Sequence, residues 1–127
     1  MGPQHLIDTN VVIDFFNGRL PISGQRLLAT TVPAISVITH IELFSKARLS
    51  SAEIAQMQQF VQVAIVYGTI TADIIEQTTA LRVQHKIKTP DAIIAATALV
   101  YDLTLITRNI SDFRAIQGIK LIDPHNL

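Results

Sequence analysis

Four acidic side chains are the residues of this chain best suited to chemistry. Asp8 directly follows a short apolar segment, Glu42 lies between apolar residues, Asp91 follows a Thr-Pro pair, and Asp112 follows the polar segment 107–109. If these carboxylates meet, their repulsion is tolerable when they hold Mg²⁺ or Mn²⁺, which prefer hard oxygen ligands. Such an ion can activate a water molecule and stabilise the leaving oxygen of a phosphodiester. The acids therefore raise the hypothesis of a metal-dependent hydrolase site.

Strand-like and helix-like segments alternate along the chain and must position these acids. Short apolar, β-branched runs predict strands at 5–7, 33–36, 64–67, 103–106 and 120–122. Helices are expected at 10–16, 37–48, 50–63, 71–86 and 89–101, with a short helical turn from residue 111. This alternation implies an α/β fold with three layers, in which a mainly parallel sheet of about five strands lies between helices. The length of 127 residues suits a single domain over 1–127.

Several helix starts have recognisable signals. Ser50 and Glu53 have the spacing of a capping box, and Thr71 is placed to cap the helix that follows it. Thr89 and Pro90 are expected at the N-cap and first helical positions, which makes Asp91 an acid of the first turn.

The expected topology brings part of the acidic set together. Ligands of open parallel α/β sheets bind outside the carboxyl ends of the strands, so Asp8 and Asp112 should both lie at that edge. Glu42 and Asp91 reach the same edge only if their helices are suitably oriented, which the sequence leaves open.

The composition limits the possible partners and cellular location. Ten Lys and Arg residues balance ten Asp and Glu residues, which argues against holding nucleic acid mainly through a basic surface. Bound divalent ions would supply positive charge where a phosphate must sit. The absence of cysteine excludes disulfides and thiolate sites, and we expect a cytoplasmic protein without a secretory signal or membrane span. The hydrophobic fraction of 49% indicates a large core and is compatible with an apolar partner surface.

Local sequence strings add a family resemblance that covers nearly the whole chain. The chain resembles the PIN-domain family, and among its members the VapC-type toxins of VapBC toxin–antitoxin pairs most closely. The most specific strings are the helix that begins near Asp91 and the segment 107–113. In chain order, the matching strings are Leu6-Ile7-Asp8-Thr9-Asn10, Glu42-Leu43, Pro90-Asp91-Ala92-Ile93-Ile94-Ala95-Ala96-Thr97-Ala98, Thr107-Arg108-Asn109 and Asp112-Phe113.

The resemblance implies a function and assigns roles to residues. It implies a three-layer α/β/α fold and a Mg²⁺- or Mn²⁺-dependent endoribonuclease that cleaves RNA by hydrolysis. It also implies a VapB-like antitoxin whose tail lies along an apolar groove, and it is compatible with a homodimer. Carried over residue by residue, the catalytic and metal-binding set is Asp8, Glu42, Asp91 and Asp112, with supporting roles for Asn10, Thr107 and Asn109.

Each candidate residue also has an ordinary structural explanation. Asp8 can simply end a strand, Glu42 can be solvated, and Asp91 and Asp112 can be acids of a first helical turn. Thr107 and Asn109 can be loop hydrogen-bonding residues. The remaining acids are interpreted as surface, cap or turn residues: Asp14, Asp73, Asp102 and Asp123. The basic residues expected near the acids either contact the RNA backbone or form a solvated face: Lys46, Arg48, Lys86, Lys88 and Arg108.

Two other functions remain open at this point. A haloacid-dehalogenase-like phosphatase would use Asp8 as its nucleophile, although such enzymes usually have a second Asp where this chain has Asn10. A degenerate PIN fold would only bind a partner, although all four acids are present.

Overall fold

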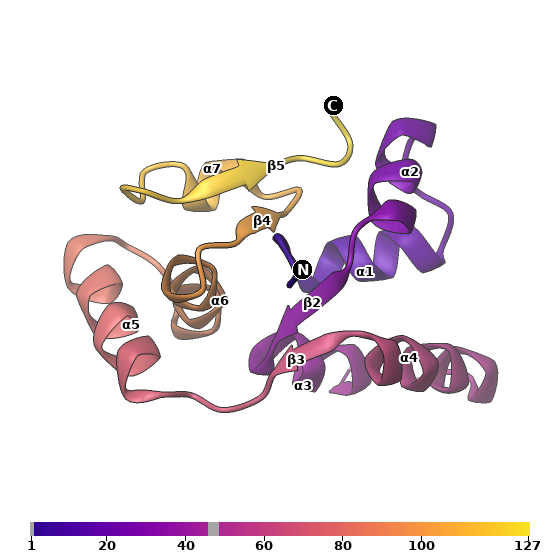
Figure 1. The fold of residues 1–127 in the computed structure, drawn as a ribbon, viewed down its shortest axis with the longest axis horizontal. Coiled ribbons are helices and arrows are strands. Elements are labelled where there is room, and N and C mark those ends of the chain that lie inside the picture. Colours follow the sequence, from indigo (N-terminus) through magenta and orange to yellow (C-terminus); the bar gives the residue numbers. More distant parts are fainter. Residues whose placement is uncertain (1, 46–48) are drawn as a thin grey trace.

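The strands form one parallel sheet, as the alternation predicts. The structure, a computed structural model, describes residues 2–45 and 49–127. Within those residues the sheet has five strands in the order β3-β2-β1-β4-β5, and every neighbouring pair is parallel (Figure 1). The strands are β1 (His5–Ile7), β2 (Pro33–Ser36), β3 (Ile65–Tyr67), β4 (Thr104–Ile106) and β5 (Lys120–Ile122).

Helices cover both faces of this sheet. The described residues contain α1 (Thr9–Phe16), α2 (Ile22–Thr30), α3 (Val37–Ser45), α4 (Ser51–Val63), α5 (Ala72–Gln84), α6 (Thr89–Val100) and α7 (Ile110–Phe113). In Figure 1, α5 and α6 lie on one side of the strands, and α1, α2 and α4 lie on the other. The expected three-layer α/β/α architecture is therefore confirmed.

The core has two parts because neighbouring strand residues point to opposite faces. Leu6 and Leu105 pack in one cluster, together with residues of α5 and α6. Ile7 and Ile106 pack in the other cluster, together with residues of α1, α2, α3 and α4. All four side chains are fully buried, which explains why these short strands are apolar at consecutive positions.

Helix α6 is largely core, as its alanines suggest. Ala92, Ala95, Ala96 and Ala98 are buried, and their small size allows close packing with neighbouring elements such as α5. No helix among residues 2–45 and 49–127 is both long enough and apolar enough to cross a membrane.

The helix-start predictions are confirmed with one shift. Ser50 and Glu53 form the expected capping box, in which each backbone N–H donates to the other residue's side chain over 3.1 Å. Thr71 caps α5 by accepting from the backbone N–H of Ile74. Helix α6 already includes Thr89, so Lys88 occupies the N-cap position and makes no side-chain cap hydrogen bond.

Helix α2 was not anticipated from the sequence. Its N-cap is Pro21, which offers no capping side chain, and Gly24 in its first turns is a poor helix former. The structure gives a reason for Gly24, because a Cβ at this position would collide with the backbone oxygen of Pro124. Close approach of the C-terminal segment therefore requires glycine here.

The strand order reverses between β1 and β4. From β1 the chain moves outward through β2 and β3, whereas β4 returns to the other side of β1 and β5 lies beyond it. A crevice forms at such a reversal, outside the carboxyl ends of the two strands, and ligands of open α/β sheets bind there. Asp8 follows β1 and Thr107 follows β4, so both residues lie at this switch point.

Candidate metal centre

Asp8 is held rigidly at the switch point. It is 5% exposed and is the N-cap of α1, where its Oδ1 accepts from the backbone N–H of Thr9 over 2.9 Å. Its Oδ2 accepts from Thr107 Oγ1 over 2.8 Å. Both carboxylate oxygens of Asp8 are thus fixed by groups that follow β1 and β4.

Glu42 reaches the same place through Thr9. The Thr9 hydroxyl donates to Glu42 Oε1 over 2.6 Å, and Thr9 Oγ1 lies 3.0 Å from Thr39 Oγ1. The backbone N–H of Thr39 in turn donates to Ser36 Oγ, which ties the start of α3 to the end of β2. The side chain of Glu42 therefore points toward the start of α1, so α3 has the orientation that the sequence left open.

Asp91 and Asp112 lie together beside a cavity of about 300 Å³. Lys86, Ile87 and Lys88 form the rest of its lining. Asp91 is partly buried at the start of α6, whereas Asp112 is exposed on α7.

Burial raises the pKa of Asp8 above its ordinary value, and the nearby Glu42 carboxylate acts in the same direction. The hydrogen bonds from Thr107 and Thr9 oppose this rise, as does the positive charge of Arg108. The balance favours the protonated form more than in a free aspartate.

Asp91 connects the two halves of the acidic set. Burial raises its pKa, followed by repulsion from Asp8, from Asp112 and from Glu42, while Lys88 opposes the rise. This repulsion places Asp91 within electrostatic range of the three other acids that the sequence singled out.

The donor set fits a hard divalent cation in chemistry and charge. Carboxylate oxygens are the preferred ligands of Mg²⁺ and Mn²⁺, and a cation would relieve the repulsion that raises these pKa values. Among the described residues, however, no three His, Asp or Glu side chains already form a group able to hold a metal ion. This is compatible with Mg²⁺, which usually keeps several water ligands and binds proteins through one or two carboxylates.

The three supporting residues differ in their contacts. Thr107 is fully buried, donates to Asp8 and accepts from the backbone N–H of Asn109 over 3.0 Å. Asn109 is the N-cap of α7 and makes no side-chain cap hydrogen bond. Asn10 lines a second cavity, which lies on the Asp8 side of the acids.

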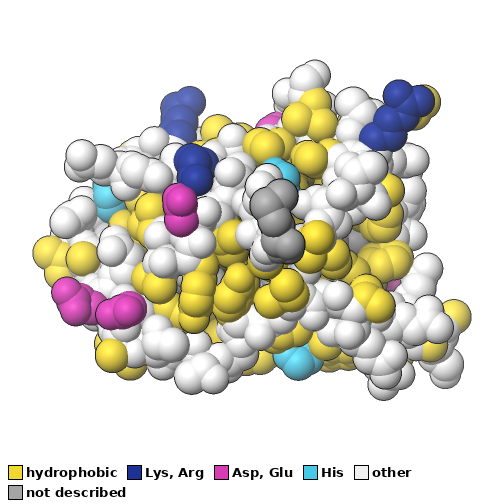
Figure 2. Space-filling model, in the orientation of Figure 1, with side chains coloured by type: hydrophobic (Ala, Val, Ile, Leu, Met, Phe, Trp, Pro, Cys, Tyr) yellow, Lys and Arg dark blue, Asp and Glu magenta, His cyan; other side chains and the backbone are white. Residues whose placement is uncertain are grey.

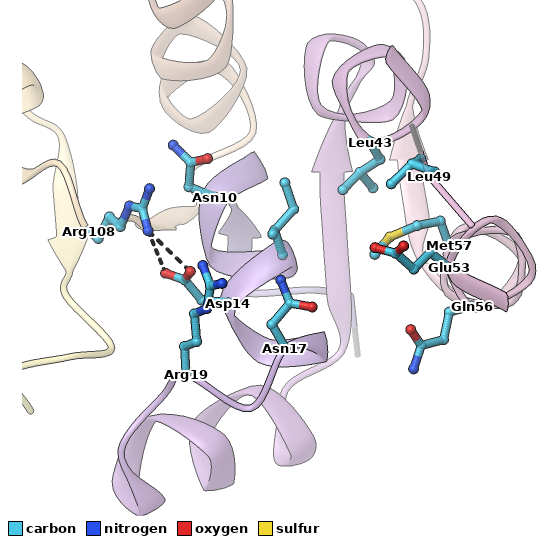
Figure 3. A pocket seen from close by; sticks show the side chains of 11 residues that line it. Asn10, Asp14, Asn17, Arg19, Leu43, Leu49, Glu53, Gln56, Met57 and Arg108 are labelled. Carbon is cyan, nitrogen blue, oxygen red and sulfur yellow. Dashed lines mark hydrogen bonds and ion pairs between the residues drawn. The ribbon is translucent and has the colours of Figure 1, made fainter. Parts of the chain in front are cut away.

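This second cavity measures about 300 Å³ and combines apolar and polar walls (Figure 3). It lies between α1 and the α3–α4 region, with Ile13, Leu43 and Met57 as apolar lining and Arg19 and Arg108 as cations.

The surface interpretation of Asp14 is wrong. Asp14 is 1% exposed, and Arg108 Nη1 donates to its Oδ1 over 3.1 Å and to its Oδ2 over 3.0 Å. His125 Nε2 lies 3.0 Å from the same Oδ2. Sequence reasoning also missed His125, because both partners of Asp14 are remote in sequence.

The basic residues near the acids are only partly described. Lys86 and Lys88 line the cavity beside Asp91, and Arg108 is near Asp8, as expected. Lys46 and Arg48 lie outside the described residues.

Comparison with known proteins identifies the family. Residues 5–119 match the family model described as "PIN domain". A toxin–antitoxin complex from Klebsiella pneumoniae contains a chain with 35% identity and a TM-score of 0.79, and the match covers 97% of this chain and 99% of that one. No curated protein sequence matched the chain.

Two further structures support the fold alone, because their identities are lower. DNA-bound VapBC from Salmonella typhimurium gives 23% identity and a TM-score of 0.78, covering 96% of this chain and 98% of that one. VapBC2 from Rickettsia felis, bound to a promoter DNA fragment, gives 24% identity and a TM-score of 0.76, and the match covers 93% of this chain and 96% of that one. The family model and the 35% identical chain show that this chain belongs to the PIN domain family.

Proposed function

We propose that this protein is a cytoplasmic, Mg²⁺- or Mn²⁺-dependent endoribonuclease and the toxin of a type II toxin–antitoxin pair. The observation that carries the proposal is the hydrogen-bonded placement of Asp8 and Glu42 at the switch point of a PIN-domain sheet, through Thr107 and Thr9. Such a cluster is costly without a counter-charge, and its oxygen-only chemistry suits a divalent ion.

The residues have distinct roles in this proposal. Asp8, Glu42, Asp91 and Asp112 would hold the ion, directly or through its water ligands, and Thr107 orients Asp8 through its 2.8 Å hydrogen bond. The bound metal would supply an activated water and charge stabilisation for hydrolysis of the RNA phosphodiester.

Hydrogen bonds within the protein fix the acidic side chains before any ligand binds. The Thr9 hydroxyl fixes the carboxylate of Glu42, and the Thr9 backbone N–H fixes that of Asp8. Asn10 and Asn109 supply polar side chains that can contact a phosphate or a water molecule beside the acids. Fixing the carboxylates in advance reduces the reorganisation needed when the ion and RNA bind.

The partner in this proposal is an antitoxin related to those of the VapBC complexes. The first support is the 35% identical chain, which comes from a toxin–antitoxin complex. The second is the cavity between α1 and the α3–α4 region, whose apolar residues could receive an apolar segment next to the acids.

A further apolar surface is compatible with a homodimer. Figure 2 shows hydrophobic side chains spread across the middle of one face, with charged side chains scattered around them. Large apolar side chains that the described residues leave exposed include Ile41, Ile75 and Val83. The homodimer stays a prediction, to be tested by the mass of the purified chain in solution.

The test is incubation of the partner-free protein with total bacterial RNA in Mg²⁺ or Mn²⁺, followed by mapping of new 5′ ends. We expect discrete cuts that require metal, vanish in Asp8→Asn and persist in Asp73→Asn, a matched change of an exposed acid on α5. Metal-independent cuts, or cuts that persist in Asp8→Asn, would contradict the proposal.

One observation favours a second candidate, the degenerate PIN fold that only binds a partner. Among the described residues, no ready-made group of three metal ligands is present. Absence of both Mn²⁺ binding and cleavage, with tight binding of an antitoxin, would support this candidate instead. The phosphatase alternative finds no support in the family match.

A further inference from the structure

A buried ionic cluster outside the four acids has no role in the function proposed so far. The Asp14 side chain is 2% exposed, yet its carboxylate contacts two side chains from distant parts of the chain, the guanidinium of Arg108 and the imidazole of His125. Burying a carboxylate costs several kcal/mol in lost hydration, and a well-packed apolar group is often at least as stable at such a position. A cluster of this kind therefore calls for an explanation beyond stability.

The location of the cluster relates it to the acidic site. Asp14 is on α1, the helix that Asp8 caps, and Arg108 directly follows Thr107, the residue that donates to Asp8. The same two segments are thus joined twice, once at Asp8–Thr107 and once at Asp14–Arg108. The guanidinium group of Arg108 is fixed relative to the Asp8 carboxylate as a result.

The guanidinium still has donors to offer. Arginine has five N–H donors, and the hydrogen bonds of Arg108 to described residues all come from Nη1 and go to Asp14. Its Nε and Nη2 make no hydrogen bond to the described part of the chain. These two nitrogens form the edge of a guanidinium that binds two oxygens of one phosphate.

The Arg108 side chain lines the second cavity. The side chain of Arg108 is 43% exposed and lines the cavity together with Asn10, Asn17 and Arg19. Figure 3 shows Arg108 next to Asp14, with Asn10 beyond it at the start of α1. A polyanion that crosses the acids would meet this cation on the Asp8 side and Lys86 and Lys88 on the Asp91 side.

Because the net charge is zero, the positions of individual cations beside the acids matter for RNA binding. With ten positive and ten negative side chains, the protein has no general excess of positive charge for attracting RNA. A few cations held beside the acids can provide the local attraction instead. The Asp14 carboxylate also lies 3.0 Å from His125 Nε2, so Arg108 is not its only neighbour.

We propose that Arg108 binds a backbone phosphate of the RNA strand next to the phosphodiester that is cleaved, with Asp14 and His125 as positioning residues for its guanidinium group. This inference rests on the proposed ribonuclease function. It assigns the Arg108 edge of the second cavity to RNA.

The test measures RNA binding as a function of salt concentration. A fluorescein-labelled, mixed-sequence single-stranded RNA is titrated in Mg²⁺ with Asp91→Asn protein, which the proposed function leaves unable to cut. Each phosphate contact to a single strand contributes about 0.7 to the slope of log affinity against log salt concentration. Replacing Arg108 by Ala should therefore lower the slope by about 0.7 and weaken binding about four-fold at 0.15 M salt.

Two further variants separate this effect from general damage. Arg108→Gln removes the charge but keeps an N–H donor for Asp14, so it should show the same slope change if the Ala variant does not fold. Arg26→Ala removes an exposed arginine on α2, away from both cavities, and should leave the slope unchanged. A folded Gln or Ala variant with an unchanged slope would overturn the proposal.

The role of Asp14 is tested by a double-mutant comparison. If Asp14 positions the guanidinium group, the Arg108→Ala change should weaken RNA binding less in an Asp14→Asn background than with Asp14 present. Equal losses in both backgrounds would overturn the positioning role. Failure of the ribonuclease function itself would be seen separately, because the protein with Asp91 intact would then leave the RNA uncut.

Discussion

Replacement of Thr107 by Val tests the contact on which the geometry of the site depends. Thr107 is fully buried, and its hydroxyl donates to Asp8 Oδ2 over 2.8 Å. Valine has nearly the same shape but cannot donate, so the change removes the hydrogen bond with little effect on packing. Thr107→Ser is the matched control, since it keeps the hydroxyl and removes one methyl group.

The expected magnitudes follow from these contacts. A hydrogen bond to a charged group contributes about 1.5–3 kcal/mol, so Thr107→Val should lower the free energy of unfolding by about 2 kcal/mol. The backbone N–H of Asn109 also loses its acceptor, but Asn109 is only partly buried and water can replace the hydroxyl. Loss of one buried methyl group should make Thr107→Ser less stable by about 1 kcal/mol.

The pH dependence distinguishes the stability loss in Thr107→Val from the stability loss in Thr107→Ser. The hydrogen bond from Thr107 lowers the pKa of Asp8, so its removal raises this pKa further. A raised pKa in the folded state penalises the charged form, and this penalty disappears when Asp8 is protonated. The loss in Thr107→Val should therefore shrink as the pH falls from 7 toward 3.8, the ordinary carboxyl value, whereas the loss in Thr107→Ser should stay constant.

The assay is urea unfolding of metal-free protein at several pH values, with thermal unfolding as a second measure. For a chain of this length, about 1 kcal/mol corresponds to roughly 4 °C in Tm, so Thr107→Val should melt about 8 °C lower at pH 7. Equal stability of the Val and Ser variants, or a loss in Thr107→Val that does not depend on pH, would show that the Thr107 hydroxyl does not stabilise the Asp8 carboxylate.

Three further perturbations test other parts of the structure. Without metal, Asp91→Asn should raise Tm at pH 7 because burial and repulsion penalise the charged carboxylate, and this gain should shrink as the pH falls toward 3.8 and the folded protein takes up the proton; a gain that does not depend on pH would contradict it. Gly24→Ala should lower the free energy of unfolding by at least about 2 kcal/mol because its Cβ meets the Pro124 backbone, and unchanged stability in urea would show that this contact is absent. Ser50→Ala should cost about 1 kcal/mol through loss of the capping box with Glu53, again measured in urea, whereas no loss would mean that α4 does not depend on its cap.

The fold was largely predictable because its signals are local. Runs such as Leu6-Ile7 and Leu105-Ile106 are apolar at consecutive positions, which marks strands covered on both faces. Helix α2 was missed because its stability depends on a distant contact. Its first turns contain Gly24, whose fit against Pro124 appears only when the C-terminal segment is in place.

The candidate site was predictable to the extent that it follows strand ends and family strings. Asp8 and Thr107 follow neighbouring parallel strands, and their contact at the switch point is a consequence of topology. The burial of Asp14 was not predictable in this way. An aspartate in a helix is usually solvated, and its partners Arg108 and His125 are brought to it only by the complete fold.

We expect the four acids Asp8, Glu42, Asp91 and Asp112, which come from separate elements, to act as one metal site. Calorimetric titration of metal-free protein with Mn²⁺ tests this expectation, with single Asp8→Asn, Glu42→Gln, Asp91→Asn and Asp112→Asn variants and Asp73→Asn as the control. We expect Mn²⁺ binding that each site variant weakens at least about ten-fold, whereas Asp73→Asn should have no effect. Absence of Mn²⁺ binding, or equal binding by the site variants and the control, would contradict it.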